Sequence, residues 1–310
     1  MTTVADEIRV ASWNVEHNGF DPDGSDERRH RAYEVMARLE PHIVLRQEET
    51  NAWHNHGRIR HQEAQRLGLT SCLSPMSPDS RTPAAVLYDP ALFTLVEEIT
   101  WSTGIGKPMT IPVVRMKETS QPLSLASVHL CPWSPQIRAI EASRLTVLGE
   151  PGKYALFGGD MNSYPHRTGA EKVALPNWSD PALTDAAHFQ HRTVERDGKR
   201  VSDTVPDEIL SGAGKPVFTE LGHLAGTVRH QPGALDPTAS LWRRDQGPRQ
   251  RIDRLYCTPN LSGALISLEV VADNEVTAVS DHALLLARFD RAAMQRALTP
   301  VSETPEENRA

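Results

Sequence analysis

YALFGGDMNS, residues 154–163, joins an apolar strand to two polar residues, Asp160 and Asn162. The apolar run over 154–161 is short and bounded by turn-forming residues, which is typical of a buried strand. A carboxylate at the end of such a strand is not explained by core packing, and the converging ends of sheets are common places for functional sites. The ends of the other strands therefore decide what kind of site this chain carries.

Nine further apolar or β-branched runs predict strands. They cover residues 8–15, 42–48, 84–88, 93–100, 111–116, 123–130, 251–258, 265–272 and 283–289. Helices are predicted over residues 26–39, 57–67, 135–148 and 217–225, with Ser25 as the cap of the first. Because hairpin-like strand pairs alternate with helices, the pattern indicates an α/β sandwich in which two packed sheets carry helices on their outer faces.

The long stretch between Asp160 and Asp253 is rich in Pro, Gly and His, and it predicts elaborated loops over about 163–250. Residues 1–290 are expected to form one domain. A short C-terminal tail, residues 291–310, is expected to begin as a helix and to end in a disordered segment.

The composition of the whole chain excludes several classes of protein. The 310 residues, the mean hydropathy of −0.44 and the formal net charge of −7 predict a globular protein with a large core, and they argue against a surface that grips nucleic acid broadly. No apolar run approaches the roughly 18 to 20 residues that span a bilayer, and the N-terminus lacks a signal peptide, so a cytoplasmic protein without membrane contact is expected. Cys72, Cys131 and Cys257 are isolated, which indicates small buried residues rather than disulfides or a zinc site.

Acidic and amide residues at the strand ends predict a site for a hard divalent cation. Asn14 and Glu16 end the strand VASWNVE, Glu48 ends HIVLRQE, and Asp281 stands before ALLLARF. Mg²⁺ prefers carboxylate, amide and water oxygens as ligands. Glu48 is the first expected ligand, and Asp281, Glu16 and Asn14 are expected to add direct or water-mediated contacts.

Phosphoester cleavage also needs a nucleophile made from water, a proton for the leaving group and cationic donors for the phosphoryl oxygens. Asp253 and His282 are interpreted as a carboxylate–histidine pair, in which Asp253 fixes the imidazole and His282 contacts the phosphate. Asp160 is expected to orient or deprotonate the attacking water, and Asn162 to hold the phosphate by hydrogen bonds. His129, in SVHL, is equally consistent with a structural role and with a further donor.

Six short motifs occur in an order that is specific as a set: WNVE, RQE, VHL, GGDMN, RIDR and SDH. Over roughly residues 7–290 the chain resembles the endonuclease/exonuclease/phosphatase superfamily, with its deoxyribonuclease I-like fold. The resemblance implies a four-layered α/β sandwich, a site at one end of two central mixed sheets, and Mg²⁺ or Mn²⁺ as cofactor. It implies a metal side with Glu48 as principal ligand beside Asn14, Glu16 and Asp281. It implies a phosphate side of Asp160, Asn162, Asp253, His282 and His129.

Two residues depart from the pattern of the family. Glu16 stands where repair-type members commonly carry Asp, and Arg46 interrupts a usually apolar strand just before Gln47 and Glu48. These departures argue against assignment to the apurinic-site repair branch. The segment 163–250 has no family pattern, and it lies where substrate-selecting loops are expected.

Three functions are compatible with these residues. The leading hypothesis is a nuclease that hydrolyses phosphodiester bonds of DNA or RNA, with the nucleic-acid backbone bound by Arg243, Arg244, Arg249 and Arg251. The second is a phosphatase or phosphodiesterase acting on a phosphorylated metabolite, nucleotide or lipid head group, which fits the negative net charge better. The third is a binding module without chemistry, which the retained acids and His282 disfavour. The oligomeric state does not follow from the sequence.

Overall fold

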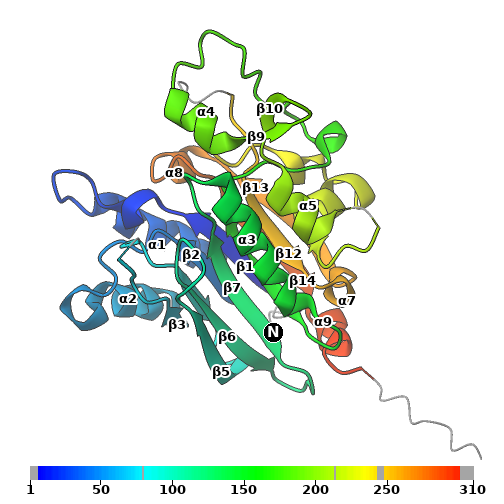
Figure 1. The fold of residues 1–310 in the computed structure, drawn as a ribbon. Coiled ribbons are helices and arrows are strands. Elements are labelled where there is room, and N and C mark those ends of the chain that lie inside the picture. Colours follow the sequence, from blue (N-terminus) through cyan, green and yellow to red (C-terminus); the bar gives the residue numbers. More distant parts are fainter. Residues whose placement is uncertain (1–5, 79, 213, 243–247, 301–310) are drawn as a thin grey trace, which may run out of the picture.

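The computed structural model describes residues 6–78, 80–212, 214–242 and 248–300, and it contains two six-stranded mixed sheets (Figure 1). The strand order in the first sheet is β13 (Leu265–Val271), β14 (Leu284–Asp290), β1 (Glu7–Asn14), β2 (Ile43–Gln47), β4 (Ala85–Tyr88) and β3 (Thr70–Leu73). The order in the second sheet is β11 (Thr219–Glu220), β12 (Asp253–Cys257), β8 (Ala155–Asp160), β7 (Leu123–His129), β6 (Met109–Met116) and β5 (Phe93–Trp101). Every predicted strand is present, with ends shifted by a few residues, whereas the sequence pattern does not predict β3 and β11.

Each sheet has one parallel strand pair at its centre. In the first sheet β1 runs parallel to β2, and in the second β7 runs parallel to β8. The other neighbouring strands of both sheets pair antiparallel. Because parallel strands end at the same edge of a sheet, each central pair presents the residues that follow it at one edge.

Apolar side chains fill the space between the sheets and cover their outer faces. Leu45, Leu125 and Leu156 lie in the core between the two sheets. The outer face of the first sheet packs against α1 (Glu27–Leu39), α2 (His54–Leu67) and α8 (Asn274–Thr277). The outer face of the second packs against α3 (Pro135–Leu145) and α5 (Val205–Ser211). The layers are therefore helices, sheet, sheet and helices, and the predicted four-layered α/β sandwich is confirmed (Figure 1).

The segment 163–250 contains regular structure where the sequence predicts mainly loops. It holds α4 (Ala186–Arg192), a hairpin of β9 (Thr193–Arg196) and β10 (Lys199–Ser202), and α5. The hairpin turns at Asp197 and Gly198, which both have positive φ. An Asp-Gly pair between two strands is a strong hairpin signal. The loop prediction is wrong for this part of the segment, although a local signal was present.

The helix ends differ in detail from the prediction. α1 begins after Asp26 rather than at a Ser25 cap, and the Asp26 carboxylate pairs with Arg29. The helix predicted over 217–225 is α6 (Leu221–His223), which continues as the π-helix η4 (Leu224–Val228). Further short helices are η1 (Glu16–Gly19), η2 (Thr146–Gly149), η3 (Thr168–Ala170), η5 (Pro232–Leu235), α7 (Pro259–Ser262) and α9 (Arg291–Ala297).

The beginning of the expected C-terminal tail packs against the body of the protein. Met294 of α9 and the following Leu298 are buried in the core between the sheets. The disordered end predicted for this tail falls on residues 301–310, which lie outside the described residues. Within the described part of the chain, no helix has both the length and the apolar surface needed to cross a membrane.

Candidate active site

The first sheet brings three of the predicted site residues to one edge. Asn14 ends β1 and Glu48 follows the parallel strand β2, and Asn14 Nδ2 donates a hydrogen bond to Glu48 Oε1 over 3.3 Å. His282 precedes β14, which pairs antiparallel with β1 and therefore starts where β1 ends. The backbone carbonyl of His282 accepts a hydrogen bond from Trp13 Nε1 over 2.9 Å. Strand pairing thus places these side chains together.

The second sheet brings three more residues to the same edge. Parallel pairing of β7 and β8 sets His129 beside Asp160, and antiparallel pairing of β8 and β12 sets Asp253 opposite Asp160. All three are buried. Asn14 Nδ2 also donates to Asp160 Oδ2 over 3.2 Å. The edges of the two sheets therefore form one site.

A polar contact joins the two sheets directly behind these residues. Gln47 Nε2 donates to Ser127 Oγ over 2.9 Å, and this hydroxyl donates to the Arg46 carbonyl oxygen over 2.6 Å. Gly159 leaves room for the contact, because a Cβ atom there would lie 2.5 Å from Gln47 Nε2 and 2.1 Å from the Val128 carbonyl oxygen. Its φ of +138° also favours glycine. The glycine before Asp160 is therefore required by both backbone and packing.

Oxygen atoms that suit a hard cation gather around Glu48. Its φ is +58°, and its Oε2 accepts the His17 backbone N–H over 3.0 Å. Burial acts to raise the pKa of Glu48, but His129, Lys107 and the hydrogen bond from the His17 backbone outweigh burial and lower the pKa, so the carboxylate is ionised. Asn14 Oδ1 is buried and has no hydrogen-bond partner among the described residues. An ionised carboxylate beside an unpartnered amide oxygen fits Mg²⁺ or Mn²⁺.

Glu16 and Asp281 are the other two residues predicted to contact the cation, and their side chains are 39% and 19% exposed. Burial, and next the neighbouring Asp281 carboxylate, raise the pKa of Glu16. Arg28 Nη1 lies 3.7 Å from Glu16 Oε2 and offsets part of this repulsion. Repulsion between two carboxylates is relieved when a cation binds near both. Contact of both carboxylates with the metal, directly or through water, stays a prediction.

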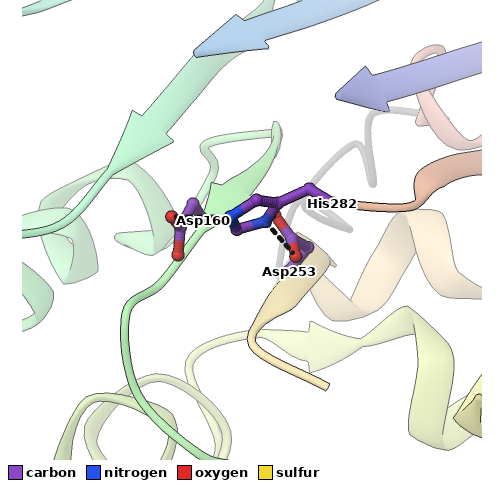
Figure 2. A group of neighbouring side chains, drawn as sticks. All are labelled: Asp160, Asp253 and His282. Atoms are coloured by element: carbon purple, nitrogen blue, oxygen red, sulfur yellow. Dashed lines mark hydrogen bonds and ion pairs between the residues drawn. The ribbon is translucent and has the colours of Figure 1, made fainter. Parts of the chain in front are cut away.

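Asp253 and His282 form a hydrogen-bonded carboxylate–histidine pair, and Figure 2 shows the His282 ring between Asp253 and Asp160. His282 Nδ1 lies 2.9 Å from Asp253 Oδ2, and Nε2 lies 3.9 Å from Asp160 Oδ2. Burial lowers the pKa of His282, but the Asp253, Asp160 and Asp281 carboxylates outweigh it and raise this pKa well above its ordinary value. Burial also raises the pKa of Asp253. Because three carboxylates face one imidazole, we place the proton of the pair on His282, which is then a cation at neutral pH.

Asp160 is held as an ionised carboxylate by donors on both oxygens. Its Oδ1 accepts the Asn162 backbone N–H over 2.8 Å, and its Oδ2 accepts Asn14 Nδ2. Burial acts to raise the pKa of Asp160, but the positive charge of His282 and the other donors lower it below its ordinary value. Asn162 has a φ of +49°, and its Nδ2 donates to the Leu130 carbonyl oxygen over 2.8 Å, which fixes the amide.

The sequence analysis does not identify Lys107, which lies against His129. Lys107 Nζ is 3.0 Å from His129 Nδ1 and 3.3 Å from Thr82 Oγ1. Burial, and next the charge of Lys107, lower the pKa of His129 to about 4, so its imidazole is neutral at physiological pH. Burial also lowers the pKa of Lys107. A single lysine in the connection between β5 and β6 gives no local signal that could have identified it.

The four arginines predicted to bind substrate differ in their surroundings. Arg251 is buried, with Nη2 2.6 Å from Glu171 Oε1 and Nη1 3.0 Å from Glu220 Oε1. Its guanidinium is therefore occupied by protein carboxylates, and the prediction that it binds a substrate backbone is wrong. Arg249 is exposed, and its role stays a prediction. Two residues of the set lie outside the described residues, Arg243 and Arg244.

Arg192 is a second cation that the sequence analysis does not identify. It ends α4, and its guanidinium donates to the Asn162 carbonyl oxygen. Together with Asp281 and His282 it lines a small cavity. Arg192 therefore brings positive charge to the site from a segment in which no family pattern is readable.

The comparisons with known proteins agree with this geometry. A family model described as the Endonuclease/Exonuclease/phosphatase family matches residues 11–282, and no curated protein matches the chain. One similar solved structure is an endonuclease/exonuclease/phosphatase from Bacteroides vulgatus, with 17% identity, a TM-score of 0.62, and coverage of 91% of this chain and 98% of that one. The human Nocturnin catalytic domain with bound sulfate is similar at 14% identity and a TM-score of 0.58, over 92% of this chain and 94% of that one. ANGEL2, a 2′,3′-cyclic phosphatase, is similar at 13% identity and a TM-score of 0.58, over 91% and 95%.

Identities this low show a shared fold alone. The family match carries more than the fold, because residues 11–282 include all the predicted site residues from Asn14 to His282 and most of the strands of both sheets. The chain therefore belongs to the endonuclease/exonuclease/phosphatase family.

Proposed function

We propose that this chain hydrolyses phosphodiester bonds with Mg²⁺ or Mn²⁺ as cofactor, and that its substrate class is DNA or RNA. One observation carries the proposal: the ionised Asp160 stands between the Asn14–Glu48 pair and the cationic His282. Water activation needs a base, and a phosphoryl group under attack needs positive charge on its oxygens. Membership in a family of endonucleases, exonucleases and phosphatases supports phosphate-ester hydrolysis.

Glu48 and Asn14 would hold the cation, with Glu16 and Asp281 completing its surroundings directly or through water. The ionised Glu48 and the unpartnered Asn14 Oδ1 support this assignment. When bound, such a cation lowers the pKa of water and neutralises charge on the phosphoryl oxygens.

A second group of side chains has the composition of a metal site. Ligand atoms of Asp160, Asp253 and His282 lie within 4.8 Å of one another (Figure 2). The hydrogen bond between Asp253 and His282 already engages two of these three groups. We therefore assign the cation to the Glu48 side. We assign proton transfer and phosphate binding to Asp160, Asp253 and His282.

Asp160 is the proposed base. Its low pKa keeps it ionised, and the donors on both oxygens fix its orientation, so it can accept a proton as water attacks phosphorus. His282 donates from Nε2 to a phosphoryl oxygen, and Asp253 keeps the imidazole oriented and charged. Asn162 and Arg192 add donors on the same side, since Arg192 is bonded to the Asn162 carbonyl.

Lys107 and His129 are proposed to serve the leaving group. The oxygen that departs from phosphorus needs a proton, and the half-buried Lys107 ammonium, whose pKa desolvation lowers, is suited to give one. The neutral His129 lies 3.0 Å from Lys107 Nζ and 3.6 Å from Asp160 Oδ2, so it lies between the acid and the base. One proton leaves Lys107 and one reaches Asp160, which balances the reaction.

A phosphatase or phosphodiesterase for small molecules is the second candidate. The net charge of −7 disfavours a long nucleic-acid interface. The pairing of Arg251 with Glu171 and Glu220 also removes one of the expected backbone contacts. A phosphorylated metabolite, a nucleotide or a lipid head group needs no row of arginines outside the site.

A substrate panel tests both candidates. Single- and double-stranded DNA, RNA and small phosphate esters are each incubated with Mg²⁺, Mn²⁺ or EDTA. We expect cleavage of nucleic acid with either metal and none with EDTA, and loss of turnover in D160N and H282Q. E150Q, which changes an exposed carboxylate, is the matched control. If nucleic acid stays intact while a small ester is cleaved, the second candidate replaces the first. Unchanged turnover in both D160N and H282Q would refute the mechanism.

A further inference from the structure

A cavity of about 570 Å³ opens beside the metal side of the site. Glu16 and His17 line it, and the His17 backbone N–H donates to Glu48 Oε2 over 3.0 Å. Phe20 and Trp242 add aromatic surface to its walls. The cavity therefore borders the site through Glu16 and His17, and a group bound in it would lie on the Glu48 side of a phosphate held there.

Trp242 presents a fixed indole ring at this cavity. Its Nε1 donates to the Thr277 carbonyl oxygen over 2.7 Å, and the Arg28 guanidinium lies 5.8 Å from the ring centroid. The residue is nevertheless 43% exposed. A fixed, partly exposed indole at the wall of a cavity offers an apolar face on which a flat ligand can stack.

The charges around the cavity indicate an uncharged occupant. All three guanidinium nitrogens of Arg28 are committed, with Nε bonded to Asp21, Nη1 to the Val279 carbonyl and Nη2 to the Phe20 carbonyl. The carboxylates of Glu16 and Asp21 add negative charge. A second phosphate would meet the repulsion of Glu16 and Asp21 here, beside an Arg28 whose charge already serves protein acceptors.

We propose that this cavity is a subsite for a nucleobase next to the scissile phosphate, and that the base stacks on Trp242. The inference rests on the proposed phosphoesterase function for the position of the phosphate. Stacking is tolerant of base identity, because every base has a π face. The subsite therefore predicts a preference for nucleotide-containing esters over equally charged esters without a base, and only weak discrimination among bases.

Two ligands that differ only by a base test the proposal. Binding of AMP and of ribose 5-phosphate is measured by titration calorimetry with Mg²⁺. We expect the wild-type protein to bind AMP about 10- to 100-fold more tightly. W242A is expected to lose most of this ratio, and W242F, which keeps an aromatic ring, to retain part of it.

Trp53 provides a matched control. Its Nε1 donates to the Ser74 carbonyl oxygen over 2.8 Å, Arg60 lies 5.9 Å from its ring centroid, and it is 38% exposed, but it is not among the residues that line this cavity. W53A is expected to keep the wild-type ratio.

Equal wild-type binding of the two ligands would refute the subsite. An unchanged ratio in W242A, or an equal loss in W53A, would refute it as well. The readout needs no turnover, so it separates this inference from the proposed function. A chain that hydrolyses no phosphate ester but shows the Trp242-dependent ratio keeps the subsite and loses the proposed function.

Discussion

Replacing Arg46 by methionine is expected to lower the free energy of unfolding by about 3–5 kcal/mol. Arg46 lies on β2 and is fully buried. Its Nε donates to Glu63 Oε1 over 2.8 Å, its Nη1 to the Trp13 carbonyl oxygen over 2.8 Å, and its Nη2 to Asn18 Oδ1 over 2.9 Å. Nη2 also lies 2.9 Å from Glu49 Oε1. Arg46 thus links the ends of β1 and β2, next to Asn14 and Glu48, to η1 and α2.

The magnitude follows from the Glu63 carboxylate that would remain. Methionine fills much of the volume of arginine, but Glu63 would stay buried without this cation, beside a Glu49 that holds its proton below about pH 8. Removing one partner of a buried ion pair costs about 3–5 kcal/mol, because the remaining charge stays desolvated. A typical domain has a total stability of about 5–15 kcal/mol. The variant is therefore expected to fold with a much smaller margin.

The loss is also expected to depend on pH. Burial, and next Glu63, raise the pKa of Glu49 to about 8. Because this folded pKa lies above the unfolded one, the stability linked to the bound proton is fully present below the unfolded pKa and is lost as pH rises through about 8. Arg46 acts to lower this pKa. Its removal should raise the pKa further, so the deficit of the variant relative to wild type should grow above about pH 8.

Urea denaturation followed by circular dichroism, at about pH 6 and about pH 9, measures both effects. The double variant R46M/E63Q should recover part of the loss, because it removes the buried Glu63 carboxylate that R46M leaves without a cation. The reasoning is refuted if R46M lies within about 1 kcal/mol of wild type at both pH values, or if its deficit shrinks as pH rises.

Three further variants test the site. In D253N the pKa of His282 should fall, so its proton is lost at lower pH; the basic limb of the pH–rate profile should shift down, with turnover reduced about 10²- to 10⁴-fold. K107M should reduce turnover about 10²-fold and raise the pKa of His129, which NMR titration measures. In G159A a Cβ 2.1 Å from the Val128 carbonyl oxygen should cost more than about 2 kcal/mol in urea denaturation, whereas G152A, also at positive φ but in open space, should cost about 1 kcal/mol. Equal losses in the two glycine variants would contradict the packing argument.

The fold was predictable because its signals are local. The apolar runs of β8 and β12 mark buried strands, and the polar residues at their ends mark the site edge. Lys107 and Arg192 escaped prediction because contacts distant in sequence position them. Arg192, for example, donates to the Asn162 carbonyl oxygen, and these two residues are 30 positions apart in the sequence.

Arg251 illustrates the opposite error. A basic stretch is visible in the sequence, but the carboxylates that neutralise it are not. Glu171 and Glu220 lie 80 and 31 residues before Arg251 and pair with it only in the folded chain. Charge read along a sequence therefore indicates a nucleic-acid surface only where the tertiary structure leaves that charge unpaired.

The contact between Gln47 and Ser127 has a consequence for how this enzyme tolerates change. It joins the sheets one residue before Glu48 and two residues before His129. Apolar packing is non-directional and permits small sliding movements of one sheet on the other, whereas a hydrogen bond fixes both distance and direction. This contact therefore fixes the end of β2 relative to β7 at the edge that carries Glu48 and His129. Core substitutions far from it should change melting temperature while leaving turnover nearly constant, and the two properties should be separable by mutation.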